Sequence, residues 1–267
     1  MPEYTQIGIT RLYNDDNRKM IKSIPDNSID LILTDPPYNI AKYSTGNINL
    51  PNRTPLNNDI ADWDKIEVDP YEYVKEFKRI LKPDGNIFVF TTYNCIGKWH
   101  EAFDHEFDTT QFMVWHKTNP APNIFKKSFL NSCELIICFW NKGHVWNFSN
   151  QKEMHNFIES PICMSPERLK NPKHPAQKPI KILQHIIEIA SNENAVVFDP
   201  FMGVASTAIA ALKSKRKFYG CEIKKDYYDA GVKRIKDFYT KNLLWLNVQH
   251  LFYFCSLHNK NSCYQRI

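Results

Sequence analysis

The chain has 267 residues, of which 43% are hydrophobic and 24% charged, and its formal net charge is +5. This composition excludes a disordered or fibrous protein and is typical of one large α/β domain. The 7 cysteines include no Cys-x-x-Cys pair, which argues against a disulfide framework and against a metal site. No segment has the pattern of a signal peptide or a membrane span, so we expect a cytoplasmic protein without membrane contact.

The first elements of the chain are short. Apolar residues between positions 7 and 13 predict one short strand, and the polar cluster at 14–17 suits a turn and a helix cap. A short helix over 18–23 is expected to follow.

A strand that stops abruptly comes next. The apolar run from Ile29 to Leu33 predicts a strand buried on both faces, as in a parallel sheet. Pro36 and Pro37 end this strand because proline has no N–H for the ladder. Asp35 and Tyr38 therefore lie at its carboxyl end, where open α/β sheets bind their ligands.

The Asp-Pro-Pro-Tyr sequence suits chemistry on the exocyclic amine of a nucleobase, whose lone pair is delocalised into the ring. Acceptors for both N–H groups would favour a pyramidal nitrogen, and the Asp35 carboxylate and Pro36 carbonyl can supply them. Tyr38 offers a face on which the base can stack. A plain strand-to-loop turn explains the tetrapeptide equally simply, so a second motif has to decide.

The middle of the chain alternates helices and strands. Residues 39–62 are polar and aperiodic, which predicts a mobile loop over a bound ligand. Hydrophobic spacing then predicts, in order, a helix over 71–81 closed by a turn at 82–85, a strand over 86–90, a helix over 99–103 and strands over 111–115 and 134–140. Residues 141–172 lose periodicity and predict a small inserted region, before an amphipathic helix over 180–189.

The second motif repeats the design of the first. A buried strand stops at Asp199-Pro200, and small residues lead into a helix over 208–212. The next strand, over 217–223, carries Glu222, and an acid about 20 residues after such a turn typically binds ribose hydroxyls. Because no glycine-rich phosphate loop is present, we expect a nucleoside cofactor without phosphates, for which S-adenosylmethionine is the candidate. A final helix over 226–239 is also expected.

Taken together, these motifs resemble the amino-group DNA methyltransferases. The resemblance rests on Asp35–Tyr38, on Asp199–Gly203 and on the intervening Lys-His-Pro-Ala-Gln-Lys-Pro sequence at 173–179, and it covers residues 9–239. The motif order is that of the β group. It implies a doubly wound, mostly parallel Rossmann-like sheet with a circularly permuted strand order. The catalytic domain would span 1–240, with target recognition in 141–172 and a tail of unknown role at 241–267.

The resemblance also implies roles for individual residues. The catalytic tetrapeptide is Asp35, Pro36, Pro37 and Tyr38. The implied cofactor-binding residues are Asp16, Asp35, Lys178, Asp199, Phe201, Met202, Gly203, Ala205, Ser206, Thr207 and Glu222. The implied DNA contacts are Lys117, Asn119, Asn123, Lys126 and Lys127. One departure stands out, because Ala205 replaces a glycine of the family's turn, where a left-handed backbone would cost about 1 kcal/mol.

The expected function is site-specific methylation of N6 of adenine in double-stranded DNA, with S-adenosylmethionine as methyl donor. N4 of cytosine stays open, because the same cluster can hold either amine. A DNA-binding protein with a degenerate cofactor pocket also stays open, whereas a nicotinamide oxidoreductase is disfavoured by the missing phosphate loop. A homodimer and a cognate restriction endonuclease are left open as partners.

Overall fold

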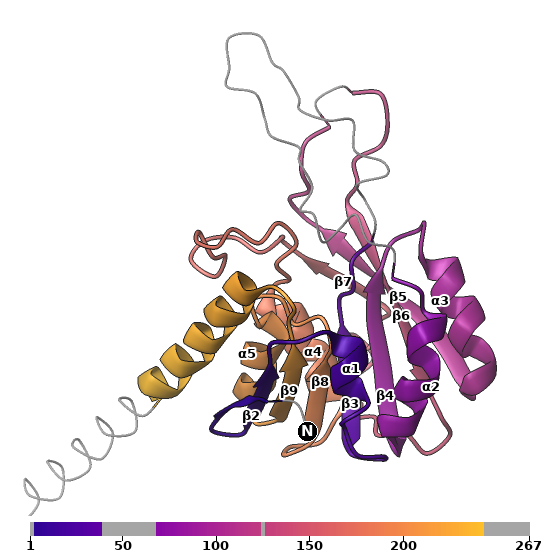
Figure 1. The fold of residues 1–267 in the computed structure, drawn as a ribbon. Coiled ribbons are helices and arrows are strands. Elements are labelled where there is room, and N and C mark those ends of the chain that lie inside the picture. The colour runs from indigo at the N-terminus through magenta and orange to yellow at the C-terminus, as the bar shows by residue number, and fades with distance from the viewer. Residues whose placement is uncertain (1–2, 39–67, 124–125, 243–267) are drawn as a thin grey trace, which may run out of the picture.

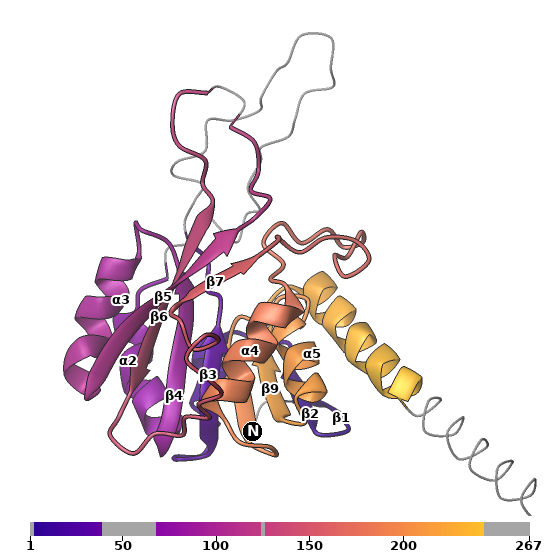
Figure 2. The same cartoon turned by 180° about the vertical axis from the view of Figure 1, so that it is seen from behind.

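The computed structural model describes residues 3–38, 68–123 and 126–242. Its centre is a 9-stranded sheet in the order β1-β2-β9-β8-β3-β4-β6-β5-β7. Helices α4 and α5 cover one face of the sheet, and α1, α2 and α3 cover the other (Figures 1 and 2). The predicted loop over 39–62 and almost all of the tail at 241–267 lie outside the described residues.

The described elements follow in chain order. The strands are β1 (Thr5–Ile7), β2 (Thr10–Tyr13), β3 (Ile29–Thr34), β4 (Leu81–Thr91), β5 (Thr109–Lys117), β6 (Cys133–Trp140), β7 (Phe157–Ser160), β8 (Val196–Asp199) and β9 (Lys217–Cys221). The helices are α1 (Asn17–Ile21), α2 (Tyr71–Ile80), α3 (Ile96–Phe103), the 3-10 turn η3 (Asp104–Glu106), α4 (Ile180–Ala190) and α5 (Ser206–Lys213). A last helix, unlabelled in Figure 1, occupies residues 225–242.

The predicted fold is confirmed at its centre. Strand β3 lies between β8 and β4 and runs parallel to both, with Leu31 opposite Val197 and Ile32 opposite Phe198. Alternate residues of β3 therefore enter two separate cores, one on each face of the sheet. Such double burial explains why the strand reads as a continuous apolar run. Because β3 and β8 are parallel neighbours, their two Asp-Pro ends lie side by side at one edge of the sheet.

Several boundaries differ from the sequence-based expectation. The first strand is a hairpin of two, β1 and β2, because Gly8 turns the chain with a φ of +53°. The expected turn at 82–85 is a bulge inside β4, where Ile29 pairs with Leu81 and Leu31 pairs with Asn86. Helix α1 ends at Ile21, two residues earlier than expected.

The region 141–172 contains one described strand, β7, which pairs in parallel with β5 at the edge of the sheet. Four residues are too few to give a recognisable alternation in the sequence. The amphipathic helix expected over 180–189 is confirmed as α4, whose apolar side packs into one core. Among the helices described, none is long and apolar enough to cross a membrane.

The two ends of the described chain touch. The Tyr239 hydroxyl accepts a hydrogen bond of 3.0 Å from the backbone N–H of Ile9. A Cβ atom on Gly8 would lie 2.3 Å from Cζ of Tyr239, so glycine is needed there for space as well as for its backbone angle. The last helix thus holds the first hairpin against the body of the molecule.

Candidate active site

A cavity of about 390 Å³ opens at the carboxyl ends of β3, β8 and β9. All but one of the expected catalytic and cofactor-binding residues line it: Asp16, Asp35, Pro36, Pro37, Tyr38, Lys178, Asp199, Phe201, Met202, Gly203, Ser206, Thr207 and Glu222. The exception is Ala205, which is fully buried behind the wall of the cavity. One cavity therefore collects residues that are up to 206 positions apart in the chain, from Asp16 to Glu222.

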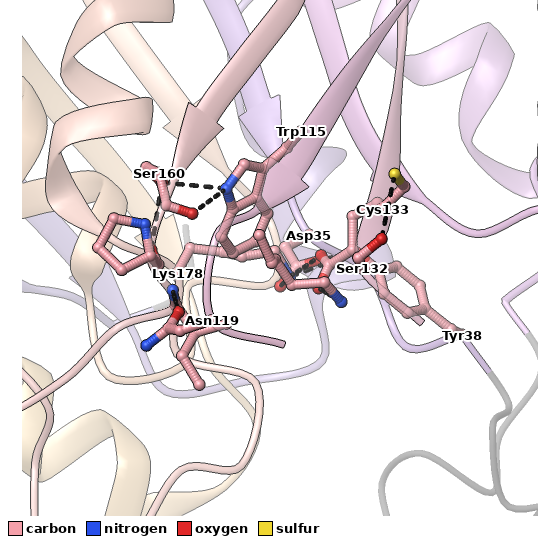
Figure 3. A network of polar contacts seen from close by, with 12 residues as sticks. Asp35, Tyr38, Trp115, Asn119, Ser132, Cys133, Ser160 and Lys178 are labelled. Carbon is pink, nitrogen blue, oxygen red and sulfur yellow. Dashed lines mark hydrogen bonds and ion pairs between the residues drawn. The ribbon is translucent and has the colours of Figure 1, made fainter. Parts of the chain in front are cut away.

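Asp35 is the central acid of the cavity (Figure 3). Its side chain is 21% exposed, and its two oxygens have different partners. The Tyr38 hydroxyl donates to Oδ1, and Nζ of Lys178 lies 2.5 Å from Oδ2. Burial raises the pKa of Asp35, and the nearby Lys178 ammonium opposes that rise. The carboxylate is thus held in place on both sides.

Lys178 sits deeper in the site than its motif suggested. The ammonium is 7% exposed and lies between Asp35 and Glu134, 3.2 Å from Oε2 of Glu134. Although burial lowers the pKa of a lysine, the two carboxylates outweigh this and raise the pKa of Lys178. The side chain therefore faces the catalytic acid, within the cavity that the other implied cofactor-binding residues line.

The sequence analysis missed Glu134. This glutamate stands near the start of β6, opposite Trp115 of β5, and its side chain is 19% exposed. Burial alone would raise its pKa, but Lys178 and Lys117 together lower it. In the sequence, Glu134 appears only as an acidic residue at the start of an apolar strand. Strands often begin with a polar residue, so this position alone does not indicate a functional role.

Asp199 holds the turn that follows β8. Its carboxylate accepts hydrogen bonds of 2.7 Å from the hydroxyls of Thr34 and Thr207, and one of 3.0 Å from the N–H of Phe201. Burial raises its pKa to about 6 in spite of these donors. Since Thr34 ends β3, this carboxylate also joins the two Asp-Pro strand ends directly.

The turn after Asp199 is left-handed at two positions. Gly203 has a φ of +52° and Ala205 a φ of +64°, so the cost named above for a left-handed backbone applies at Ala205. The last helix supports the turn, because Nη1 of Arg234 donates to the carbonyl of Val204. Gly231 of the same helix leaves room for the Ala205 methyl, because a Cβ atom on residue 231 would lie only 3.1 Å from Cβ of Ala205.

Glu222 and His174 close the cavity beside this turn. Glu222 accepts hydrogen bonds from the N–H groups of Gly203 (3.0 Å) and Lys224 (2.7 Å), and burial raises its pKa. A Cβ atom on Gly203 would come within 3.0 Å of Nε2 of His174, so glycine is what allows this close approach. Burial and Lys178 lower the pKa of His174 to about 4, which keeps the imidazole neutral at pH 7.

The opposite wall is built from α1. Asp16 caps this helix by accepting from the N–H of Arg18 at 2.9 Å, and it also pairs with the Arg18 guanidinium. Asn17 is a further residue that the sequence analysis missed. Its amide donates to the Pro200 carbonyl, and its carbonyl oxygen accepts from the Tyr73 hydroxyl, each at 3.0 Å.

The residues expected to contact DNA fall into two groups. Lys117 is 11% exposed and pairs with Glu134 at 3.3 Å, so it belongs to the buried charges of the site and does not face solvent. Asn119 accepts from the N–H of Ile162 and ties β5 to the 161–173 segment. Asn123 bonds the chain at Lys126 and Ser128 and so shapes a turn.

Lys126 and Lys127 lie in the second group, on an arm formed by residues 118–123 and 126–132 between β5 and β6. The arm projects from the edge of the sheet that carries the cavity (Figures 1 and 2). Both lysines are exposed, and the Phe129 side chain beside them is completely exposed. The arm therefore presents cationic and aromatic groups outside the core.

A doubly wound sheet with two Asp-Pro strand ends around one cavity defines the class of Rossmann-like α/β enzymes that act at the carboxyl edge of the sheet. The family model described as DNA methylase, N6_N4_Mtase, matches residues 29–233. The chain therefore belongs to the family of DNA methyltransferases that modify N6 of adenine or N4 of cytosine.

Individual relatives agree with this assignment. The chain is 31% identical over 243 residues to the type II methyltransferase M2.LlaDCHI of Lactococcus lactis subsp. cremoris, covering 84% of this chain and 88% of that protein. It is 29% identical over 245 residues to M2.DpnII of Streptococcus pneumoniae, covering 84% and 89%. Among solved structures, the complex of M1.HpyAVI with S-adenosylmethionine superposes with a TM-score of 0.61 at 26% identity, covering 84% of this chain and 99% of that one.

The cytosine-N4-specific PvuII methyltransferase shares the fold with a TM-score of 0.59, at 18% identity and with coverage of 87% and 92%. At this identity the similarity concerns the fold alone.

Proposed function

We propose that the protein transfers a methyl group from S-adenosylmethionine to N6 of adenine within a specific sequence of double-stranded DNA. The observation that supports this most is the single cavity shared by the ends of β3 and β8. Asp35 and Asp199 both line it, and the hydroxyl of Thr34, the residue before Asp35, donates to the Asp199 carboxylate at 2.7 Å. A base held at one strand end and a methyl donor held at the other would meet in that cavity.

The residues present fit a nucleoside cofactor. A cavity of about 390 Å³ is within the usual range for small-molecule sites. Glycine at position 203 keeps the wall open where any Cβ would press on His174, and Glu222 offers carboxylate oxygens beside that turn. S-adenosylmethionine supplies an electrophilic methyl group on sulfur, and Phe201, Gly203 and Glu222 would hold it. The similarity to the M1.HpyAVI complex supports this cofactor.

Asp35 and the carbonyl of Pro36 would then act on the target amine. By accepting its two N–H groups they orient the nitrogen lone pair toward the donor, and the Asp35 charge stabilises the positive charge that develops on nitrogen. Reaching the amine requires the base to leave the duplex, because the reacting atoms lie deep in a protein cavity. The Tyr38 ring borders the same space, with its hydroxyl on Asp35.

The second candidate is transfer to N4 of cytosine, which the matched family includes. Aspartate at position 35 favours adenine as the target base, because members of the family that methylate adenine usually carry aspartate at this motif position. Mass spectrometry of nucleosides from DNA methylated by the purified protein separates the two. N6-methyladenine is the expected product, and N4-methylcytosine alone would replace the adenine assignment.

The variant Asp35→Ala tests the proposed reaction. Without the acceptor, methyl incorporation into DNA should fall by a factor of about 10³ or more, whereas calorimetric affinity for S-adenosylmethionine should stay within about threefold. Full activity in Asp35→Ala would refute the role of this carboxylate. The likeness to type II methyltransferases supports a restriction endonuclease as a cellular partner of the proposed enzyme.

A further inference from the structure

Four largely buried charged side chains form a row that starts at the catalytic acid. From Asp35 the row passes to Lys178 at 2.5 Å, from Lys178 to Glu134 at 3.2 Å, and from Glu134 to Lys117 at 3.3 Å. The four side chains come from four separate segments, namely the end of β3, the segment before α4, and strands β6 and β5. Their charges alternate in sign and sum to zero.

Two of these four residues have no place in the reaction as described so far. Glu134 lines the cavity and Lys117 lies behind it, and neither is paired with Asp35 directly. A buried charge is costly to keep unless it is paired, so a pair at this depth is weak evidence for stability alone. The effect of Glu134 on the position of the Lys178 ammonium explains this arrangement of charges better.

Lys178 forms ion pairs with two carboxylates on opposite sides of its ammonium group. Its ammonium reaches Oδ2 of Asp35 on one side and Oε2 of Glu134 on the other, and it also lies 3.3 Å from the Tyr38 hydroxyl. Among the described residues, Glu134 is the one carboxylate other than Asp35 that pairs with this ammonium, and the Tyr38 hydroxyl and the Tyr38 and Phe90 rings carry no full charge to replace it. Without Glu134, the ammonium could move over the Asp35 carboxylate and compete with the target amine for the second oxygen.

We propose that Glu134 is a positioning residue for methyl transfer, which restrains the Lys178 ammonium on Oδ2 of Asp35. Oδ1, which already accepts from the Tyr38 hydroxyl, then keeps its second lone pair as an acceptor for the target amine. This inference rests on the proposed function and adds to it a residue outside the tetrapeptide. In this role Glu134, which also lines the cavity, acts through Lys178.

The negative charge of Glu134 has a second effect, on the strength of the acceptor. Among the described residues, the charged or titratable groups that face Asp35 are Tyr38, Lys178, Glu134 and Asp199. Burial is the largest contribution that raises the pKa of Asp35, Lys178 opposes it, and Glu134 raises it further. Removing the Glu134 charge should therefore lower the pKa of Asp35 and make it a weaker acceptor.

The variant Glu134→Gln tests the proposal by single-turnover methylation between pH 5 and pH 9. We expect the rate to fall about 10- to 100-fold while affinity for S-adenosylmethionine stays within about threefold. The acidic limb of the profile should move to lower pH, which a merely structural role would not produce. Glu134→Asp keeps the charge and should retain an acidic limb near that of the wild type, with a rate between the two.

A matched control is Lys82→Met, which breaks the 2.6 Å ion pair with Asp30 at the other end of β3 and should leave rate and profile unchanged. A wild-type rate in Glu134→Gln, or a slower rate with an unmoved acidic limb, overturns the proposal. If Glu134→Gln fails to fold by thermal melting, Glu134→Asp decides, because a wild-type rate with the shortened side chain overturns it as well. Failure of the wild-type protein to methylate any DNA would instead refute the proposed function.

Discussion

Asp199 shows how a single buried carboxylate ties the site to the stability of the fold. Its pKa is raised from 3.8 to about 6 by burial, so the folded state binds a proton more readily than the unfolded chain. Below about pH 4, near the pKa of the unfolded chain, this carboxyl makes its full contribution to the free energy of unfolding. The contribution is lost as the pH rises from about 4 through about 6, the pKa in the folded state. A shift of about two units corresponds to roughly 3 kcal/mol.

The variant Asp199→Asn should remove this dependence. Urea unfolding of both proteins from pH 4 to pH 7 would give a difference in unfolding free energy that changes by roughly 3 kcal/mol, with the wild type losing relative stability toward pH 7. His174 works in the opposite direction, since its lowered pKa favours the fold at higher pH, and the difference between the two proteins cancels its effect. A flat difference curve would contradict the assignment.

Glu222 is predicted to matter for the cofactor. Replacing it with alanine removes the acceptor for the Gly203 N–H and the carboxylate beside the turn. Affinity for S-adenosylmethionine, measured by calorimetry, should weaken about 10- to 100-fold. The control Glu193→Gln alters an exposed ion pair with Lys215 and should bind normally. Unchanged affinity in Glu222→Ala would remove this residue from the site.

Residues within one motif could be predicted, and residues that meet only in space could not. The turn that contains Ala205 belongs to a motif, so the cost of a left-handed backbone there could be stated from the sequence, and its φ is +64°. Glu134 and Asn17 reach the site from β6 and α1, and neither belongs to a sequence motif. Their contribution comes from packing between segments that are far apart in the chain, which no local pattern records.

At the scale of elements, the arm between β5 and β6 carries the clearest prediction for DNA. Lys126 and Lys127 are exposed on it and would contact phosphates. The double variant Lys126→Gln/Lys127→Gln should bind all duplex sequences more weakly, and the slope of log affinity against log salt should fall by about 1 per lysine. Fluorescence anisotropy at several salt concentrations measures both quantities.

Lys213 provides the matched control for the arm. It is an exposed lysine at the end of α5, and its neutralisation should leave DNA affinity unchanged. If Lys213→Gln lowered DNA affinity as much as the arm variant does, the arm would not be a specific DNA-contacting element.

Elements with strong periodicity were predicted well, whereas edge elements were not. Strand β3 and helix α4 stand in the core, where burial on fixed faces imposes a pattern on the sequence. The β1–β2 hairpin and β7 lie at the two edges of the sheet and are only three or four residues long. Their formation depends on a neighbouring strand that the local sequence does not reveal.

At the scale of the whole molecule, the proposed cofactor would join segments from both ends of the chain. Binding to the folded state alone stabilises it by about 2.7 kcal/mol when the ligand is present at 100 times its Kd. For a chain of this size we expect Tm to rise by about 5–10 °C in a thermal melt. Asp35→Ala should keep this rise, and Glu222→Ala should lose about half of it or more at the same ligand concentration. No rise in the wild-type protein would contradict cofactor binding.

The pairing of β2 with β9 has a consequence for synthesis on the ribosome. Thr10 stands opposite Phe218, so the first strands cannot find their place until more than 200 residues have been made. At roughly 5–20 residues per second, this amounts to a wait of about 10–40 s. Strands β3, β4, β5, β6 and β7 can pair with one another in the meantime. The β1–β2 hairpin thus lacks its neighbour in the sheet until β9 has emerged.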